Sequence, residues 1–498
     1  MNNVTPNIPI KFIQDETGSA TPLAIGFSVI FIVLGGPAVD YNKAMGERTQ
    51  MQMAADSAAH AAAYSWEFQT TDTSTQIAMA TTTGMLPDIA FRDALQPTDI
   101  EYGFWDPGTG QFTIDPTFEE DKDDPRRSAV RSFAELEPER ANESRNIFLS
   151  MVGQDNFTIR VSSIYASYYP PCLNEGFVAE GVVDMQSNAA YFDGFCMHSN
   201  TYVSLNQNNF FEAGTVVSMP NLADLDIPDD GFEKNEGLQA ALRTSKYRLR
   251  ILRQLPQMFE ALYNGETSYG AQEFGTLSGL TAGDPVIYPL NLEGNGNGAK
   301  AGYSEQDVID ALAALAADPT STALDDITRY VENDGATKTL SPINFYPRNR
   351  IYRVNCTGNA RLNLDPGTYD DITLITNCDV NMNSGSSAPV ILDGTLIAAE
   401  GDVSASHSRL GLDDNCDPGG GAAIWTYSTF QATSGLEGYG AQILALGDID
   451  FTANADGMEG VSFISGGVID GTSNGNMGFC DGLGTQDFVA APYFRMVN

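Results

Sequence analysis

Histidine is scarce in this sequence of 498 residues, which holds only His60, His198 and His407. The spacings HExxH, CxxC and GxxxxGKS/T are absent, and these are short signatures of zinc hydrolases, dithiol sites and P-loop nucleotide binding. Few groups are therefore suited to acid–base catalysis or metal ligation near neutral pH. We expect the protein not to be an enzyme and to have no catalytic, cofactor-binding or metal-binding residue.

Basic residues are also few: 26 Lys and Arg stand against 65 Asp and Glu, which gives a net charge of −39. Contacts to nucleic-acid phosphates need Lys and Arg, so this balance excludes nucleic acid as the expected partner. The hydrophobic fraction is 42%, with 48 glycines, so the chain is predicted to bury a core and to contain many turns rather than to be a disordered acidic tail.

One long uncharged run is present, from Ala20 to Val39. Twenty helical residues span roughly 30 Å, which is enough to cross the hydrocarbon of a bilayer. A buried helix of a soluble core and a cleaved secretory signal are the alternatives, but Asp15 and Glu16 fit a signal peptide poorly. We therefore predict a retained single span after a cytoplasmic segment at residues 1–19. The Ala- and Met-rich stretch that follows should continue the helix to about residue 69.

Three segments around this run resemble the N-terminal region of TadG-type proteins of the tight-adherence (Flp) pilus assembly system, a TadE/TadG-like region. They are FIQDETGSA at residues 12–20, AVDY at 38–41 and RTQMQMAADSAAHAAA at 48–63. Asp40 and Asp56 are the family positions at the helix exit. Pilins carry a Glu five residues after the processing glycine, whereas Leu23 occupies that position after Gly18 here. This departure favours a retained span.

The resemblance implies a fold, a location and partners. It implies a structural protein of the bacterial inner membrane, with the large C-terminal region in the periplasm or at the cell surface. The basic residues Lys11, Lys43 and Arg48 do not fix the orientation, so this placement depends on the cysteines and on the resemblance. Other pilus subunits would contact the N-terminal helix. The alternative is an exported adhesin that binds a cell-surface or matrix ligand. The Asp402–Ser406 stretch matches the DxSxS metal motif of von Willebrand A domains, but its surroundings favour a polar turn.

The fold class expected is α+β, with four regions after the helix. A pilin-like unit at residues 70–171 contains a hairpin at Ile100–Ile114 and a helix at Pro138–Val152. Short β-prone runs at residues 172–230 and 339–498 favour a parallel β-helix, with a β-sandwich as the alternative. A helical insertion at residues 231–338 separates them, with further helices predicted from Ser304 and over Leu324–Asn333.

The six cysteines form local pairs along the chain, and sequential disulfides are the simplest pairing among the fifteen that six thiols allow. The first pair also resembles the family pattern. Buried free thiols of a cytoplasmic protein are the alternative. The disulfide candidates are Cys172 with Cys196, Cys356 with Cys378, and Cys416 with Cys480.

Three further groups of charged residues are candidates for function, but each also has a purely structural interpretation. Basic residues crowd a stretch predicted to be one helix, where they would neutralise the protein's own acids or bind an acidic partner: Arg243, Lys246, Arg248, Arg250 and Arg253. The acidic loops Asp224–Gly231 and Asp413–Asp417 would suit Ca²⁺, but they lack EF-hand spacing and are interpreted as solvated surface. A polysaccharide-cleaving enzyme would need acids on one β-face, for which the candidates are Asp365, Asp370, Asp371 and Asp379.

Overall fold

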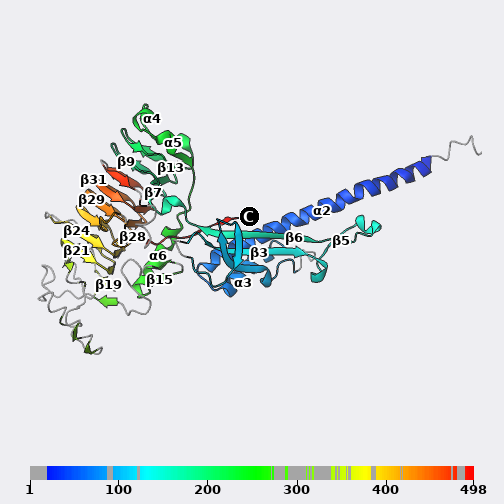
Figure 1. Ribbon diagram of the computed structural model, residues 1–498, viewed down its shortest axis with the longest axis horizontal. Coiled ribbons are helices and arrows are strands. Elements are labelled where there is room, and N and C mark those ends of the chain that lie inside the picture. The colour runs from blue at the N-terminus through cyan, green and yellow to red at the C-terminus, as the bar shows by residue number, and fades with distance from the viewer. Residues whose placement is uncertain are drawn as a thin grey trace, which may run out of the picture. The chain divides into compact units, whose positions relative to one another are not determined.

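The computed structural model of the chain (Figure 1) describes residues 20–86, 93–120, 124–270 and most of 338–497. Between 271 and 337 it describes 272–273, 287–289, 310, 313–314 and 317–318, and the gaps after 338 are 343–344, 346–347, 355, 357–360, 383–387, 416, 418, 473–474, 479 and 481–487. The chain divides into two compact units. Unit 1 comprises Met1–Tyr168 with Tyr493–Asn498, and unit 2 comprises Tyr169–Pro492.

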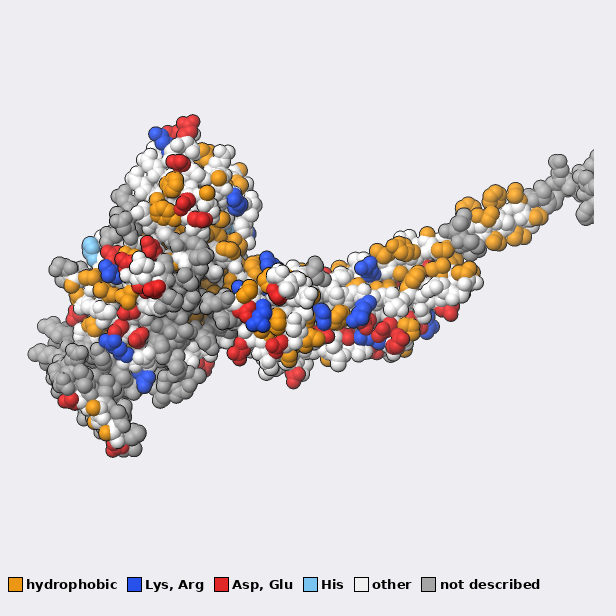
Figure 2. Space-filling model, viewed as in Figure 1, with side chains coloured by type: hydrophobic (Ala, Val, Ile, Leu, Met, Phe, Trp, Pro, Cys, Tyr) orange, Lys and Arg blue, Asp and Glu red, His pale blue; other side chains and the backbone are white. Residues whose placement is uncertain are grey.

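Unit 1 begins with one helix of 47 residues, α2 (Ala20–Trp66), which continues through Pro37. Its first half is exposed and apolar, and Figure 2 shows hydrophobic side chains gathered at that end. Among the residues that the structure describes, Thr21–Trp66 is the single helix long and apolar enough to cross a membrane. The predicted continuation of the span into a second helical half is confirmed, since no break separates the two halves.

The second half of α2 and α3 (Thr71–Thr83) pack with an antiparallel sheet ordered β2-β1-β3-β6-β35. The predicted hairpin is confirmed as β1 (Ile100–Asp106) and β2 (Gln111–Ile114), joined by a turn in which Asp106 accepts the Gly108 N–H. The remaining strands are β3 (Arg127–Leu136), β6 (Ile159–Tyr168) and β35 (Tyr493–Met496).

The predicted helix at Pro138–Val152 is wrong. That segment contains two short 3₁₀ turns, η4 (Pro138–Arg140) and η5 (Leu149–Val152), and the strand β4 (Ser144–Arg145), which pairs with β5 (Asn156–Phe157). Ala141 follows η4 with a positive φ of 52°, which ends helical geometry there. A third 3₁₀ turn, η3 (Pro97–Asp99), precedes β1, and Asp99 pairs with Arg140 across the two turns (Oδ2 to Nη1 2.6 Å).

Unit 2 is a parallel β-solenoid of about 10 turns, which confirms the β-helix expectation over the β-sandwich. One sheet has 11 strands, all paired in parallel. In spatial order they are β14 (Leu242–Thr244), β13 (Val216–Met219), β10 (Cys196–Ser199), β7 (Gly176–Ala179), β32 (Ser462–Ser465), β30 (Ala441–Ala445), β28 (Ala422–Thr426), β25 (Thr395–Ala399), β22 (Ile372–Thr376), β19 (Arg350–Val354) and β17 (Ile287–Pro289).

A second sheet of 15 strands forms the other faces. Its main path is β11 (Val203–Leu205), β8 (Val183–Met185), β33 (Ile469–Thr472), β31 (Ile449–Glu459), β29 (Phe430–Tyr439), β26 (Val403–Ser404), β23 (Asp379–Asn381), β20 (Arg361–Leu364) and β18 (Lys338–Leu340). Off this path lie β9 (Ala190–Tyr191), β12 (Phe210–Phe211), β21 (Gly367–Asp370), β24 (Val390–Asp393), β27 (Ser408–Leu410) and β34 (Asn476–Gly478).

The two β-rich regions that the sequence separates form a single stack. β7, from the first region, pairs in parallel with β32, from the second, and Phe177 lies opposite Phe463. The solenoid is therefore built from two runs of coils that meet at this pair, around a core that includes Phe177, Phe195, Phe451 and Phe463. The predicted second β-rich region, residues 339–498, ends too late. Its last strand, β35, pairs with β6 and belongs to unit 1.

Part of the predicted helical insertion is present as α4 (Gly231–Lys234), α5 (Leu238–Ala241) and α6 (Arg250–Tyr263), interrupted by β14. In α6 the ring of Phe259 lies 4.2 Å from Tyr427 and 6.4 Å from Trp425 of β28, so this helix covers the outside of the first sheet. The helices predicted from Ser304 and over Leu324–Asn333 lie mostly outside the described residues. Other short elements are η6 (Pro171–Leu173), η7 (Leu222–Asp224), β15 (Ser268–Tyr269) and β16 (Gln272–Glu273).

Candidate functional site

Asp40 ends the apolar half of α2, and its side chain is buried against the turn that leads into η5. Its carboxylate accepts hydrogen bonds from the backbone N–H groups of Ile147 (2.9 Å), Phe148 (2.8 Å) and Leu149 (2.7 Å). Hydrogen bonds to an ionised acceptor are stronger than neutral ones, so one carboxylate fixes three consecutive backbone groups. The sequence marked Asp40 as a family position, and the structure gives it this contact.

Gly36 lies one turn before Asp40 on the same face of α2, where it is buried beside Phe148. A Cβ on Gly36 would stand 2.6 Å from the Cβ of Phe148. Only a residue without a side chain allows so close an approach. Gly36 and Asp40 thus form a seat on α2 for residues 147–149.

Further contacts join α2 to the β4–β5 hairpin, which carries residues 147–149. Lys43 donates from Nζ to the Arg145 carbonyl (2.7 Å) and pairs with Glu47 (3.3 Å), which in turn accepts a hydrogen bond from the Ser144 hydroxyl. No sequence pattern revealed the contacts of Lys43 with Arg145 and of Glu47 with Ser144, because these partners are about a hundred positions apart in the chain.

Asp56, the second family position, lies within the packed half of α2 rather than at the end of its apolar half. It accepts a hydrogen bond from Gln52 Nε2 (2.8 Å), and Gln52 also donates to the Ser162 carbonyl of β6 (3.1 Å). Near it, an Ala-rich face is buried in the core of unit 1 together with Met51. Its alanines are Ala54, Ala55, Ala58, Ala59 and Ala62. Ser132 of β3 donates to the Ala55 carbonyl (2.7 Å), so the strand approaches the helix backbone closely.

Two of the predicted cysteine pairs are disulfides. Cys172 bonds to Cys196 with 4.8 Å between Cα atoms, and Cys356 bonds to Cys378 with 5.3 Å. Cys480 is also disulfide-bonded. Its predicted partner, Cys416, lies outside the described residues, so that pairing stays a prediction.

The basic residues around α6 do not share one helix as predicted. Arg243 belongs to β14, while Arg250 and Arg253 belong to α6. The buried Arg250 donates to the Pro492 carbonyl, and Arg243 donates to the Ala240 and Leu242 carbonyls (2.7 Å each). At least these two arginines therefore serve local backbone contacts.

Asp402 of the DxSxS stretch caps a turn between coils. Its carboxylate accepts hydrogen bonds from the Ser428 hydroxyl and from the Thr429 hydroxyl (2.9 Å) and N–H (3.2 Å), and these bonds, that of Ser428 first, lower the pKa of Asp402. Of the four candidate acids, Asp379 accepts the Asp402 N–H (3.1 Å) and Asp370 pairs with Arg348. These carboxylates hold the solenoid's corners.

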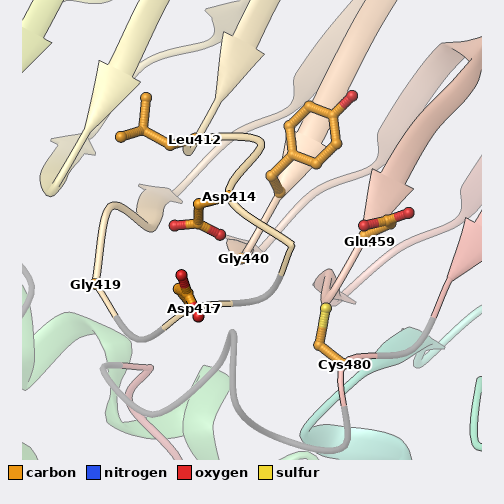
Figure 3. A pocket seen from close by; sticks show the side chains of 8 residues that line it. Leu412, Asp414, Asp417, Gly419, Gly440, Glu459 and Cys480 are labelled. Atoms are coloured by element: carbon orange, nitrogen blue, oxygen red, sulfur yellow. The ribbon is translucent and has the colours of Figure 1, made fainter.

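The acidic loop at Asp413–Asp417 borders a small pocket. Leu412, Asp414, Asp417, Tyr439 and Glu459 line it, together with Cys480 (Figure 3). Within the residues that the structure describes, no group of three or more His, Cys, Asp or Glu side chains is arranged to hold a metal ion.

A row of aspartates runs across three neighbouring coils. Asp450 pairs in register with Asp470, and Asp470 with Asp184. Burial, followed by the charge of a neighbouring aspartate, raises the pKa of Asp450 and Asp470. For Asp184, burial and the charge of Asp226 raise the pKa, although a hydrogen bond from Ser204 opposes them.

Residues 176–289 and 296–481 match the family described as a domain of unknown function (DUF7867), which is more than half of the chain. The chain belongs to the DUF7867 family. Its N-terminal residues 18–65 match the Tad family, described as Flp pilus-assembly TadE/G-like, as the resemblance of Asp40, Asp56 and their neighbours predicted. No curated protein and no solved structure matches the chain. The DUF7867 match covers the solenoid, while the Tad match covers α2.

Proposed function

We propose that this chain is a non-enzymatic structural component of the Flp (tight-adherence) pilus assembly system, held in the bacterial inner membrane by residues 20–39 with its large C-terminal region exported. The observation that carries the proposal is α2. Its first half is exposed and apolar, its second half is packed in a folded unit, and both lie in the segment that matches the TadE/G-like family.

The disulfides support an exported solenoid. Cys172–Cys196 and Cys356–Cys378 close loops within unit 2. Structural disulfides persist in the periplasm and at cell surfaces, whereas the cytoplasm keeps thiols reduced. The span would therefore have its N-terminal end in the cytoplasm.

The Ala-rich face of α2 is not available to a partner subunit. Ala55, Ala58 and Ala62 are buried in the protein's own core, so that face is occupied. Tyr41 (60% exposed) and Met45 (40% exposed) lie one turn apart, just beyond the span. We assign contacts with other pilus subunits to this exposed pair.

The test is a count of surface pili by electron microscopy in cells that lack the chain, complemented with the wild type, with Tyr41→Ser/Met45→Ser or with Ile114→Ser. Ile114 is a matched control because it is exposed (56%) on the hairpin of unit 1. We expect few or detached pili without the chain and with the double variant, and normal pili with the control.

Two other outcomes are informative. Normal pili with impaired surface attachment in cells lacking the chain would favour the adhesin function and direct attention to the solenoid. Normal pili together with normal attachment would overturn both the assembly role and the adhesin role.

A further inference from the structure

Residues 147–152, IFLSMV, form an apolar tip at the end of the β4–β5 hairpin. Ile147 is 57% exposed, Met151 71% and Val152 73%, and Ser150 is the one polar residue in the segment. Bulky apolar side chains gathered at such exposure mark an interaction surface. We call this segment the 147–152 tip.

The place of the 147–152 tip along α2 identifies what covers it. Phe148 lies against Gly36, four residues inside the apolar run from Asp40, and the hairpin runs beside α2 (Figure 1). Four helical residues correspond to about 6 Å along the axis. If Ala20–Val39 fills the hydrocarbon of a bilayer, Phe148 lies near the outer boundary of that hydrocarbon. Interfacial apolar segments bind at this boundary and bury their side chains roughly 5–10 Å into it.

The backbone of the tip is prepared for an environment with little water. Asp40 accepts from the N–H groups of Ile147, Phe148 and Leu149, and the Met151 N–H donates to the Phe148 carbonyl (3.1 Å). After the tip, the N–H groups of Gly153 and Gln154 bond back to carbonyls within it. Backbone donors must be satisfied internally where lipid replaces water.

We propose that the 147–152 tip inserts into the lipid bilayer beside α2 and forms a second membrane contact of unit 1. The inference rests on the proposed anchoring by α2. Lipid is favoured over a protein partner because the tip lies level with the end of the apolar run, where the bilayer already surrounds α2. The two contacts together would fix the tilt and rotation of unit 1 on the membrane.

The experiment uses the full chain in vesicles of phosphatidylethanolamine and phosphatidylglycerol. Spin labels are placed singly at Met151→Cys, at Ile30→Cys in the span, and at Ile114→Cys as an exposed apolar control. The native cysteines that the structure describes are all disulfide-bonded, so among them the introduced cysteine is the one free thiol that the label can modify. Collision with oxygen, which concentrates in lipid, is compared with collision with a water-soluble nickel chelate. We expect a several-fold higher oxygen-to-nickel ratio at Met151 and Ile30 than at Ile114.

Each other outcome is decisive. A ratio at Met151 equal to that at Ile114, with Ile30 in lipid, would overturn the tip proposal and leave the anchor in place. Protection of Met151 from both reagents would mean a protein contact and would also overturn it. A water-exposed label at Ile30 would refute the anchor itself. A label at Val152→Cys repeats the measurement in case the first substitution perturbs the turn.

Discussion

Phe148 lies so close to Gly36 that a Cβ on the glycine would come within 2.6 Å of the Phe148 Cβ. The adjacent Gly35 has nothing within 4 Å of the same position. Two neighbouring glycines of one helix therefore have different roles, and only Gly36 is required for seating the 147–152 tip.

Gly36→Val should separate the tip from α2. Overpacking of this kind costs about 1–3 kcal/mol, which corresponds to roughly a 5- to 150-fold rise in local opening. Amide hydrogen exchange at residues 147–149 in detergent measures it. Gly35→Val is the matched control and should leave exchange at these amides unchanged. Equal effects of the two substitutions would contradict a specific role of Gly36 in packing against Phe148.

Asp40→Ala should expose the three backbone donors of residues 147–149 to solvent exchange. We expect their exchange to accelerate at least several-fold, because each loses a charge-assisted acceptor. Asp56→Ala is the control, since its carboxylate accepts from the side chain of Gln52 and not from the tip. If both variants exchange alike, Asp40 has no special role in holding the turn.

Ala58→Leu should destabilise unit 1 by about 1–3 kcal/mol, because the added side chain enters a well-packed core. Ala58 is 0% exposed among the small residues that face the sheet. Thermal unfolding in detergent checks the prediction. Gln50→Leu, at an exposed position of the same helix, should have little effect. An unchanged Ala58→Leu protein would mean that this face is free to bind another subunit.

Replacing Cys172 and Cys196 together by serine should lower the free energy of unfolding of unit 2 by about 3 kcal/mol, from loop closure over 24 residues. Denaturant unfolding without reductant measures it. The same double substitution at Cys356 and Cys378, which are 22 residues apart, should cost a similar amount. A large difference between the two pairs would show that loop closure is not the main source of the stabilisation.

The aspartate row should make unit 2 more stable in mild acid. The pKa values of Asp184, Asp450 and Asp470 are raised in the folded state, so protonation of these side chains favours folding. This contribution to the free energy of unfolding is fully present below the ordinary pKa of 3.8 and is lost as the pH rises through the raised values. Asp470→Asn should therefore stabilise unit 2 at neutral pH by up to about 1 kcal/mol at low salt. The gain should vanish near pH 3.8, the ordinary aspartate pKa.

Thermal unfolding across this pH range checks the aspartate prediction. Glu233→Gln, at an exposed position of α4, removes the same charge outside the row and serves as the control. A gain equal to that control would assign the effect to net charge, and a gain independent of pH would exclude titration of the row.

The family and the general fold class were predictable from local patterns. Each of these patterns involves residues close together in the chain. They are the long uncharged run, the Ala-rich continuation with Asp40 and Asp56, and the short β-prone runs with local cysteine pairs. The helix prediction at Pro138–Val152 failed because this segment takes its conformation from partners outside it, one nearby in the chain and one distant. Strand β4 pairs with β5, and Asp40 supplies the acceptors that η5 needs.

The sequence by itself determined that the chain has a long apolar helix, a TadE/G-like N-terminal region and a β-rich remainder with locally spaced cysteines, because hydrophobic periodicity, side-chain volume and cysteine spacing are local properties. Only the tertiary structure decided that β7 meets β32 in one solenoid, that the Ala-rich face of α2 is buried in its own core, and that Gly36 and Asp40 hold the 147–152 tip at the end of the apolar half of α2. Those outcomes depend on contacts between residues far apart in the chain, such as Ala55 with Ser132 and Phe177 with Phe463, and the free energy of such contacts leaves no local signature in the sequence.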